Sequence, residues 1–200
     1  MTPAQEGELP TRERLIAATW RVVRDEGLRA ATSRRITDEA GANLGSITYH
    51  FGSKGQLIAE TSTRRMSEWM APLGAALAAD TTDGGDRTSA VIDSLLAIFV
   101  LGRADARALL EVLSASELTD VRAALGQQLR RFQTLVSEVI ATQQRRGDVP
   151  GSAQPSAAAG LFTAIALGLM TQEALDAHPV PVQQIVAELL SILTNATRAP

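Results

Sequence analysis

The chain has 200 residues, a formal net charge of −3 at pH 7 and no cysteine. This length suits one or two small domains, and 45% hydrophobic residues are enough for a packed core. Because only 4% of the residues are aromatic, that core must consist mainly of Leu, Ile, Val and Ala, which favours helices over a sheet. The absence of cysteine excludes disulfides, thiolate metal sites and cysteine nucleophiles.

The distribution of charge leaves room for a nucleic-acid partner. The net negative charge argues against a general nucleic-acid coat, but cations and anions nearly balance within residues 1–54. A domain near neutrality still binds DNA if its cations lie on one face. The start of the chain lacks a signal-peptide pattern, and the weakly charged run 151–172 is too polar in its first half to span a bilayer. We therefore expect a cytoplasmic protein with no membrane partner.

The first third of the chain predicts a short tail followed by three helices. Residues 1–10 are expected to be disordered. Apolar residues then recur at helical spacing from Thr11, a possible N-cap, until Gly27. A short helix is expected over 33–40, and another leads up to Phe51.

Two breaks delimit these short helices. Gly41 interrupts the pattern after the first of them, and Asn43 is a suitable N-cap for the second. Ser53 with Gln56 three residues later reads as a capping box, from which a long helix runs to roughly Ala79.

The rest of the chain also predicts helices only. Residues 80–87 read as a flexible loop, and no stretch shows the period-two alternation of a strand. Apolar residues recur at helical spacing over residues 88–101, 104–115, 120–146, 156–177 and 181–198. The sequence therefore predicts an all-α chain of about nine helices.

Residues 33–50 carry the pattern of a helix-turn-helix. Such a motif needs two short helices packed steeply across a tight turn, and Gly41 supplies a residue that tolerates positive φ. Ile36, Ile47 and Phe51 are expected to pack against the first helix. The remaining surface of the second helix contains no acidic residue, so it can approach a phosphate-lined groove without repulsion. That surface consists of Leu44, Gly45, Ser46, Thr48, Tyr49 and His50.

The run from Thr32 to Leu57, TSRRITDEAGANLGSITYHFGSKGQL, resembles the signature of the TetR family of bacterial repressors. Its most characteristic part is the string YHFGSK, which begins at Tyr49. The resemblance covers residues 11–60, and beyond them it rests on the number and spacing of helices. One departure is Thr37, where the motif more often has alanine.

The resemblance implies an all-α homodimer in which each subunit has two domains. Residues 11–53 would form a three-helix DNA-binding domain that enters the major groove at one half of a palindromic operator. Residues 54–200 would form a domain that dimerises and binds a small-molecule inducer. Inducer binding would release the protein from double-stranded operator DNA.

The resemblance also implies roles for single residues. Ser33 and Arg34 would open the positioning helix, and Lys54, the chain's single lysine, would contact phosphate at the start of the long helix, where the helix dipole favours an anion. Base edges would meet Leu44, Gly45, Ser46 and Thr48, and phosphates would meet Tyr49 and His50. The implied DNA contacts are Thr32, Ser33, Arg34, Leu44, Gly45, Ser46, Thr48, Tyr49, His50 and Lys54.

Several of these assignments have alternatives. Arg34 could be a solvated surface charge, and His50 could be a capping or core residue. Arg35 could be the true DNA contact, or it could pair with Asp38 or Glu39. For Leu44 the residues leave two interpretations open, contact with thymine methyl groups and simple packing.

The second domain carries weaker signals. A cavity for an apolar or amphipathic inducer is predicted, with Glu111, Gln172 or Glu173 to orient the ligand, although most of its residues could equally be ordinary core. Its lining would be Met66, Trp69, Phe99, Leu110, Leu113, Phe132, Phe162, Met170 and Gln172. Small residues in the penultimate helix permit close helix approach and predict a dimer interface, with intramolecular packing as the alternative. Its residues would be Gly160, Leu161, Ala164, Gly168, Leu169, Ile185, Leu189 and Ile192.

The sequence favours a regulator over an enzyme. The two histidines, His50 and His178, lie far apart in the chain, and there is no cysteine, so little is left for nucleophile or metal chemistry. No cofactor and no metal are expected. A ligand-responsive repressor is the leading interpretation. The alternative is a regulator of the same fold that is controlled by a protein partner or that acts as an activator.

Overall fold

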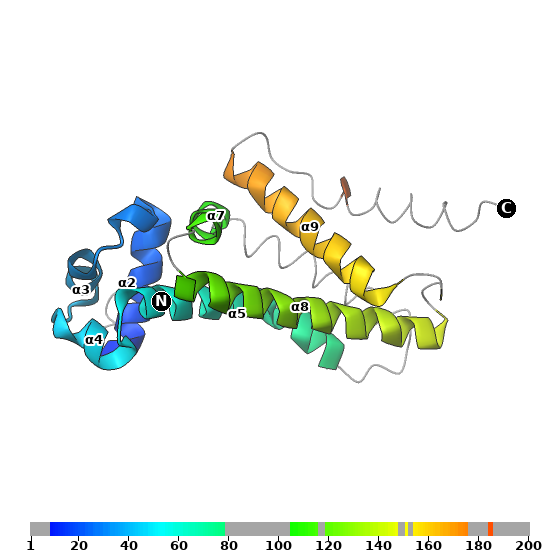
Figure 1. Cartoon of the computed structure of the whole chain (residues 1–200), viewed down its shortest axis with the longest axis horizontal. Coiled ribbons are helices and arrows are strands. Elements are labelled where there is room, and N and C mark those ends of the chain that lie inside the picture. The colour runs from blue at the N-terminus through cyan, green and yellow to red at the C-terminus, as the bar shows by residue number, and fades with distance from the viewer. Residues whose placement is uncertain are drawn as a thin grey trace. The chain divides into compact units, whose positions relative to one another are not determined.

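The computed structural model describes residues 9–78, 105–115, 119–147, 151, 154–175 and 184–185. Within these ranges there are seven α-helices, one 3-10 helix and no strand (Figure 1), so the all-α prediction is confirmed. The predicted helix over 88–101, nearly all of that over 181–198 and the predicted loop over 80–87 lie outside the described residues. The predicted tail does too, except for its last two residues.

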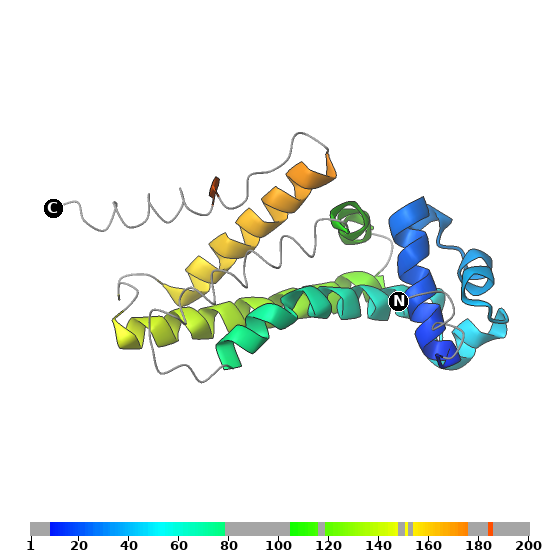
Figure 2. The same cartoon turned by 180° about the vertical axis from the view of Figure 1, so that it is seen from behind.

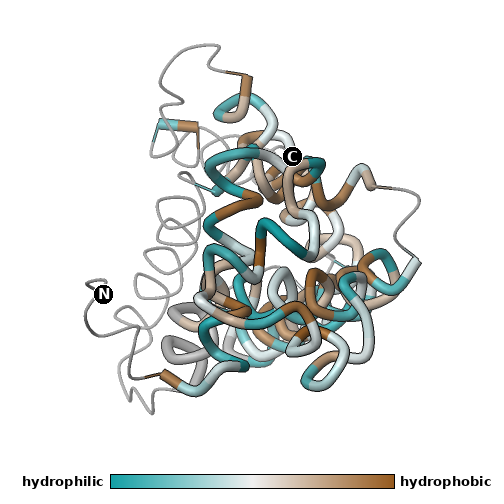
Figure 3. The backbone as a smooth tube through the Cα atoms, turned by 90° about the vertical axis from the view of Figure 1, so that its left-hand side faces the viewer, coloured by the Kyte–Doolittle hydropathy of each residue, from teal (hydrophilic) through white to brown (hydrophobic). Residues whose placement is uncertain are grey.

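The chain divides into two compact units. The first comprises residues 1–68 and 107–128, and the second comprises residues 69–106 and 129–200. In Figure 3 hydrophobic and hydrophilic stretches alternate within single helices, as expected for helices that bury one face.

The first unit contains the short N-terminal helices. Its elements are α2 (Thr11–Glu26), η1 (Leu28–Ala30), α3 (Ser33–Ala40), α4 (Gly45–Phe51), the first part of α5 (Lys54–Ala78), most of α7 (Ala106–Ser114) and the first part of α8 (Thr119–Arg146). Thr11 is the first residue of α2, and the residue that precedes the helix is Pro10, so the predicted threonine cap is wrong.

The core of the first unit is aliphatic, as the composition predicts. Leu15, Val22 and Val23 of α2 are fully buried together with Ile36 of α3, and α2, α3 and α4 contact one another. Other buried residues of this core are Trp20, Ala40, Ile47, Phe51, Leu57, Ile58, Leu109, Val112, Val121 and Leu125. Burial of each large side chain stabilises the fold by about 1.5–3 kcal/mol. This stabilisation holds the short helices in place, because helices of seven or eight residues are unstable alone.

The second unit is built on α8 and α9 (Pro155–Ala174). Phe132 and Val136 of α8 are buried against Ala159 of α9. The Phe132 ring lies 5.9 Å from that of Phe162, centroid to centroid. Met70, Ile140 and Phe162 pack around this cluster. Figure 2 shows α8 and α9 from behind.

Helix α9 leaves one uncharged side exposed. Besides Ser156 and Gln172, five exposed positions follow one another at intervals of four and three residues, which is the spacing of a single helix face. They are Ala157, Leu161, Ala164, Gly168 and Thr171, and Leu175 continues the series just past the helix. By length and composition alone α9 would suffice to cross a membrane, but core helices of soluble proteins also meet that criterion.

A glycine ends α2 in a conformation that other residues avoid. Gly27 has φ 88° and ψ 162°, and its N–H donates to Val23 O. The next amide, Leu28 N–H, donates to a carboxylate oxygen of Glu111 on α7 at 2.9 Å. A Cβ on Gly27 would lie 3.1 Å from that same oxygen, Oε2. The α2 end therefore needs glycine for both its backbone and its contact with α7.

We expect Gly27→Ala to lower the free energy of unfolding by about 1–3 kcal/mol, because this backbone region is essentially restricted to glycine. Thermal or urea unfolding measures the change. Gly55→Ala is the matched control, since Gly55 lies within α5 and its Cβ would meet its neighbours at ordinary distances of 3.6 Å or more. The control should leave stability unchanged or raise it by up to about 1 kcal/mol. Equal effects of the two substitutions would contradict this account of Gly27.

Candidate nucleic-acid interface

The turn between α3 and α4 forms as the sequence predicts. Gly41 adopts the left-handed conformation with φ 59° and ψ 40°, which ends α3. Arg14 has a role that no local pattern predicts, because its guanidinium donates from Nε to Ala40 O at 3.1 Å and from Nη2 to Gly41 O at 3.4 Å. An arginine of α2 thus satisfies carbonyls at the α3 C-terminus and fixes the turn against the first helix.

Asn43 supplies a capping bond at the start of α4, although the residue directly before the helix is Leu44 and not the predicted Asn43. Its Oδ1 accepts from the Ser46 N–H at 3.0 Å and from the Ser46 hydroxyl at 3.0 Å. On the inner side of α4, Ile47 and Phe51 are buried in the core of the first unit. These contacts decide which side of α4 faces outward.

The outward side of α4 is exposed and uncharged. Leu44 is 59% exposed and Tyr49 is 85% exposed, while Gly45 and Thr48 are also exposed. Ser46, in contrast, is only 9% exposed.

His50 is half-buried, with its ring edge-on to that of Tyr49 at 4.9 Å between centroids. The region around α4 is thus an open face that contains no carboxylate between Leu44 and Phe51.

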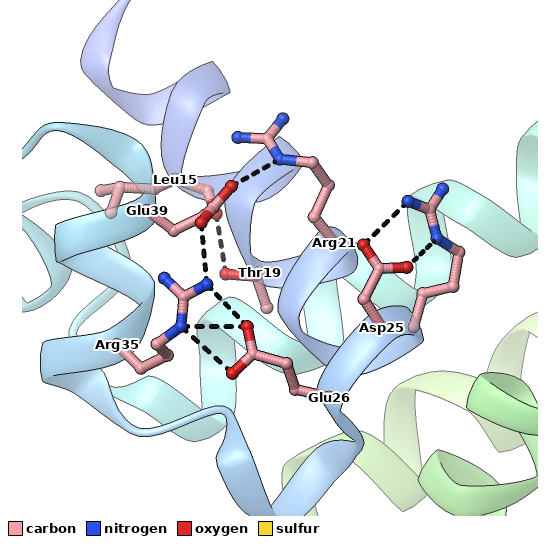
Figure 4. Close-up of polar contacts among 8 residues, drawn as sticks. Leu15, Thr19, Arg21, Asp25, Glu26, Arg35 and Glu39 are labelled. Carbon is pink, nitrogen blue, oxygen red and sulfur yellow. Dashed lines mark hydrogen bonds and ion pairs between the residues drawn. The ribbon is translucent and has the colours of Figure 1, made fainter.

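The two neighbouring arginines of α3, Arg34 and Arg35, differ in their side-chain partners. Arg35 donates from Nε to both carboxylate oxygens of Glu26, at 3.0 and 3.1 Å, and its Nη2 lies 2.9 Å from Glu39 Oε2 (Figure 4). These bonds, that to Glu26 first, raise the pKa of the Arg35 guanidinium above its ordinary value. Arg34 is exposed, and no carboxylate of the described residues pairs with it. Arg34 is therefore the arginine of this pair that is available to an external anion.

Most other arginines near the motif are engaged within the protein. Arg12 bonds Glu60 at 2.6 Å and lies 5.0 Å above the Phe51 ring. Arg64 pairs with Glu13, and Arg65 lies 5.8 Å from the Trp20 ring. Of the cations that the structure describes between residues 9 and 78, three make no hydrogen bond or ion pair through their side chains. They are Arg29, Arg34 and Lys54.

The helix starts around these free cations are capped by hydroxyl groups. Thr32 Oγ1 accepts from the Arg35 N–H at 3.2 Å at the start of α3, where Ser33 is half-buried. Ser53 Oγ accepts from the Gln56 N–H at 3.1 Å at the start of α5, which is the serine half of the predicted capping box. Thr37, the departure from the family motif, is buried with its hydroxyl bonded to Ser33 O and Arg34 O.

Glu39 contributes stability that depends on pH. Its bonds to Arg21, at 3.0 Å, and to Arg35 hold the pKa of the Glu39 carboxyl below its usual value of 4.5. A carboxyl whose pKa is lower in the folded state stabilises the fold above its unfolded pKa, and this stabilisation is lost as the pH falls through the folded pKa.

We expect Glu39→Gln to reduce the free energy of unfolding at pH 7 by up to about 1 kcal/mol, since the ion pairs are partly exposed. The difference from the wild type should shrink as the pH falls below 4.5 and vanish once Glu39 is protonated in the folded protein. Thermal unfolding of both proteins across this pH range measures it. A difference that stays constant down to the lowest pH would contradict the assignment to Glu39.

The residues predicted for the ligand cavity are distributed over both units. In the second unit Phe132 and Phe162 lie together and Trp69 is buried. Met66 is buried in the first unit, Gln172 is exposed, and Phe99 lies outside the described residues. The remaining positions are Leu110 and Met170, which are half-buried, and Leu113, which is exposed. Glu111, expected to orient a ligand, instead bonds the Leu28 amide.

Three of the eight residues predicted for a dimer interface, Leu161, Ala164 and Gly168, are exposed on α9, and Gly160 is half-buried. Leu161 is 52% exposed, and a Cβ on Gly160 or Gly168 would meet no atom within 4 Å among the described residues. Leu169 is buried within its own chain. Ile185 is half-buried, and Leu189 and Ile192 lie outside the described residues.

Two family models match the chain. The family model described as "Bacterial regulatory proteins, tetR family" matches residues 15–61. A second family model, "BetI-type transcriptional repressor, C-terminal", matches residues 84–197, which is more than half of the chain.

Individual relatives agree with these matches over shorter segments. The chain is 35% identical over 57 residues to the HTH-type transcriptional regulator PksA of Bacillus subtilis, which is 28% of each protein. It is 36% identical over 69 residues to the HTH-type transcriptional repressor KstR2 of Mycolicibacterium smegmatis, which is 34% of this chain and 32% of KstR2. The chain thus spans about a third of the length of these relatives.

A solved structure shares the fold over most of the chain. The transcriptional regulator FadR of Bacillus subtilis, solved in complex with stearoyl-CoA, superposes with a TM-score of 0.71 at 15% identity. The match covers 89% of this chain and 96% of FadR.

Proposed function

The chain belongs to the TetR family of bacterial regulatory proteins, and on that premise we propose that it is a cytoplasmic, ligand-responsive repressor that binds a palindromic operator as a homodimer. It is a transcriptional regulator with a helix-turn-helix formed by α3 and α4.

The exposed side of α4 is the observation that carries the DNA-binding part of this proposal. Two buried residues, Ile47 and Phe51, fix the helix on the core, so that Leu44, Thr48 and Tyr49 project outward where no acidic side chain accompanies them. A helix of this kind fits the major groove, which is wide enough to admit it. We assign base contacts to Leu44, Gly45 and Thr48, and we leave out Ser46 because its hydroxyl is bonded to Asn43.

The unpaired cations would anchor the protein to the DNA backbone. Arg34 at the start of α3 and Lys54 at the start of α5 flank α4 in the chain, and neither pairs with a described carboxylate. Thr32, Ser33, Tyr49 and His50 would add hydrogen bonds to phosphates. Arg29, which the sequence did not single out, is exposed on η1 just before α3 and joins this set. Such contacts set position and affinity, while base contacts set specificity.

Helix α9 would supply the dimer interface. An exposed leucine, small residues and no charge along one helix face are what close packing against a second copy requires. The open space beside Gly160 and Gly168 leaves room for the backbone of a partner helix. Ile185, Leu189 and Ile192 would extend the interface along the C-terminal segment.

The second unit would hold the inducer. Phe132, Phe162 and Met70 form an apolar cluster between α8, α9 and the end of α5, which suits a small apolar or amphipathic molecule. The structurally similar FadR was solved with stearoyl-CoA, a molecule of that kind. Inducer binding would favour dimers whose two α4 helices no longer match successive major grooves.

Selection of DNA by the full-length protein tests this function. The protein is incubated with a randomised duplex library, and the bound fraction is amplified and sequenced over several rounds. We expect an inverted repeat to be enriched, because two identical subunits present two identical reading helices. Tyr49→Ala protein should retain the same sequence preference with weaker binding. Failure of the wild-type protein to enrich any sequence would overturn the proposal.

A thermal-shift screen against a metabolite library tests the ligand part separately. A molecule that binds the native protein raises the unfolding midpoint in proportion to its concentration relative to its dissociation constant. A hit should also dissociate the protein from the selected duplex. If the protein binds its operator but no small molecule raises the unfolding midpoint, regulation by a protein partner is favoured over regulation by an inducer.

A further inference from the structure

The composition of α4 restricts how it can read a base pair. Guanine is read best by Arg or Lys, adenine by Asn or Gln, and cytosine by Asp or Glu. None of these six residue types occurs from Leu44 to Phe51. Direct reading by α4 must therefore use contacts other than the bidentate hydrogen bonds on which most specific DNA contacts depend.

Two polar residues outside α4 that could read bases, Asn43 and Arg35, are already occupied, while the unpaired Arg34 and Lys54 are assigned to phosphates. Asn43 would need both Oδ1 and Nδ2 to read adenine, but its Oδ1 accepts two bonds from Ser46. Arg35 would be able to read guanine, but its guanidinium is bonded to Glu26 and Glu39. The structure thus takes these groups out of base recognition.

Two of the outward groups of α4 are apolar, the Leu44 side chain and the methyl group of Thr48. Leu44 is 59% exposed, and Thr48 follows it by one helical turn on the same side, also exposed. The intervening Gly45 has no side chain, so nothing of its own covers the Leu44 isopropyl group. Of the groups that base pairs present in the major groove, only the C5-methyl of thymine is apolar.

We propose that Leu44 and the methyl group of Thr48 recognise thymine C5-methyl groups, so that this protein reads its operator by apolar contact rather than by paired hydrogen bonds. The inference rests on the proposed DNA-binding function. It predicts that each half-site contains at least one thymine that contributes to the affinity through its methyl group and not through its hydrogen-bonding edge.

Replacement of thymine by deoxyuridine tests this directly, because it removes the C5-methyl and nothing else. Thymines of the selected duplex are replaced one at a time in one half-site, and binding of the full-length protein is measured by fluorescence anisotropy. We expect a loss of about fourfold in affinity at the critical position, the value of one buried methyl group. Leu44→Ala protein should bind more weakly overall and should no longer distinguish thymine from deoxyuridine there.

Thr48 provides a matched pair of variants. Thr48→Val keeps methyl groups and removes the hydroxyl, and it should retain thymine discrimination at the base pair that Thr48 contacts. Thr48→Ser keeps the hydroxyl and removes the methyl, and it should lose that discrimination. Circular dichroism verifies that all variants fold, which exposed positions should allow.

The possible results distinguish a failure of methyl recognition from a failure of the proposed DNA-binding function. If the wild-type protein selects a sequence but no deoxyuridine substitution weakens binding, methyl recognition is wrong while the function stands. If discrimination persists in Leu44→Ala and Thr48→Ser, other residues read the methyl groups and the assignment is overturned. If no sequence is selected at all, the proposed function itself fails.

Discussion

Leu161→Arg is expected to convert the protein from a dimer into a monomer and to weaken operator binding by about 100-fold or more. Leu161 lies 52% exposed in the uncharged face of α9, where two copies of the helix are proposed to pack. An arginine there would bring two unpaired charges into the interface, which costs several kcal/mol. Separate subunits lose the effective concentration by which one bound half-site helps the other, a factor of about 10² to 10⁴.

Size-exclusion chromatography with light scattering measures the oligomeric state, and anisotropy with the selected duplex measures binding. Gln127→Arg is the matched control, because it adds the same charge at an exposed position of α8 that lies in the first unit. The control should stay dimeric and bind as the wild type does. A dimeric Leu161→Arg protein with wild-type affinity would show that α9 packs elsewhere.

Arg34→Ala is expected to weaken DNA binding by about tenfold, while Arg35→Ala changes it little. A free arginine that binds phosphate releases counterions, so each lost contact lowers the slope of log affinity against log salt by about 0.9. A dimer carries two copies, and the slope should fall by about 1.8 in Arg34→Ala protein. Arg35 is already neutralised by Glu26 and Glu39, so its removal should leave the slope unchanged.

Adjacent positions make this a controlled comparison, since both substitutions remove the same side chain from the same helix. Binding is measured between low and moderate salt for the three proteins, and thermal unfolding is recorded for each. Arg35→Ala should lower the unfolding midpoint more than Arg34→Ala does, because only Arg35 links α3 to Glu26 of α2. A salt slope that falls in Arg35→Ala and not in Arg34→Ala would reverse the assignment.

Local sequence signals predicted the helix-turn-helix well. The start and end of α3 coincide with the predicted 33–40, Gly41 has the predicted role, and Asn43 supplies a capping bond to α4. These features depend on a few neighbouring residues, whose backbone preferences and capping bonds are visible in sequence. The buried positions of α2, α3 and α4 follow the same helical periodicity.

Local sequence patterns do not predict contacts between segments that are distant in the chain. For Arg35 the sequence leaves open a DNA contact or a pair with Asp38 or Glu39; the pair with Glu39 forms, but Glu26 on another helix is also a partner and no local pattern predicts it. Glu111 is one of three residues that the sequence suggests for orienting a ligand, whereas in the structure it bonds Leu28, 83 positions away in the chain. Ser46 is a local case, since it lies on the predicted reading helix and its hydroxyl bonds the side chain of Asn43, three residues earlier. For Arg35 and Glu111 tertiary packing, and not local pattern, decides the partner.

Methylation interference on the selected duplex tests the central claim most directly, because N7 of guanine lies in the major groove. Insertion of α4 from each subunit predicts that binding is blocked by methylation at two symmetric clusters, whose centres lie about one helical turn or a multiple of it apart. Leu161→Arg protein should lose both clusters together. Binding that is unaffected by methylation anywhere in the major groove would contradict recognition by α4.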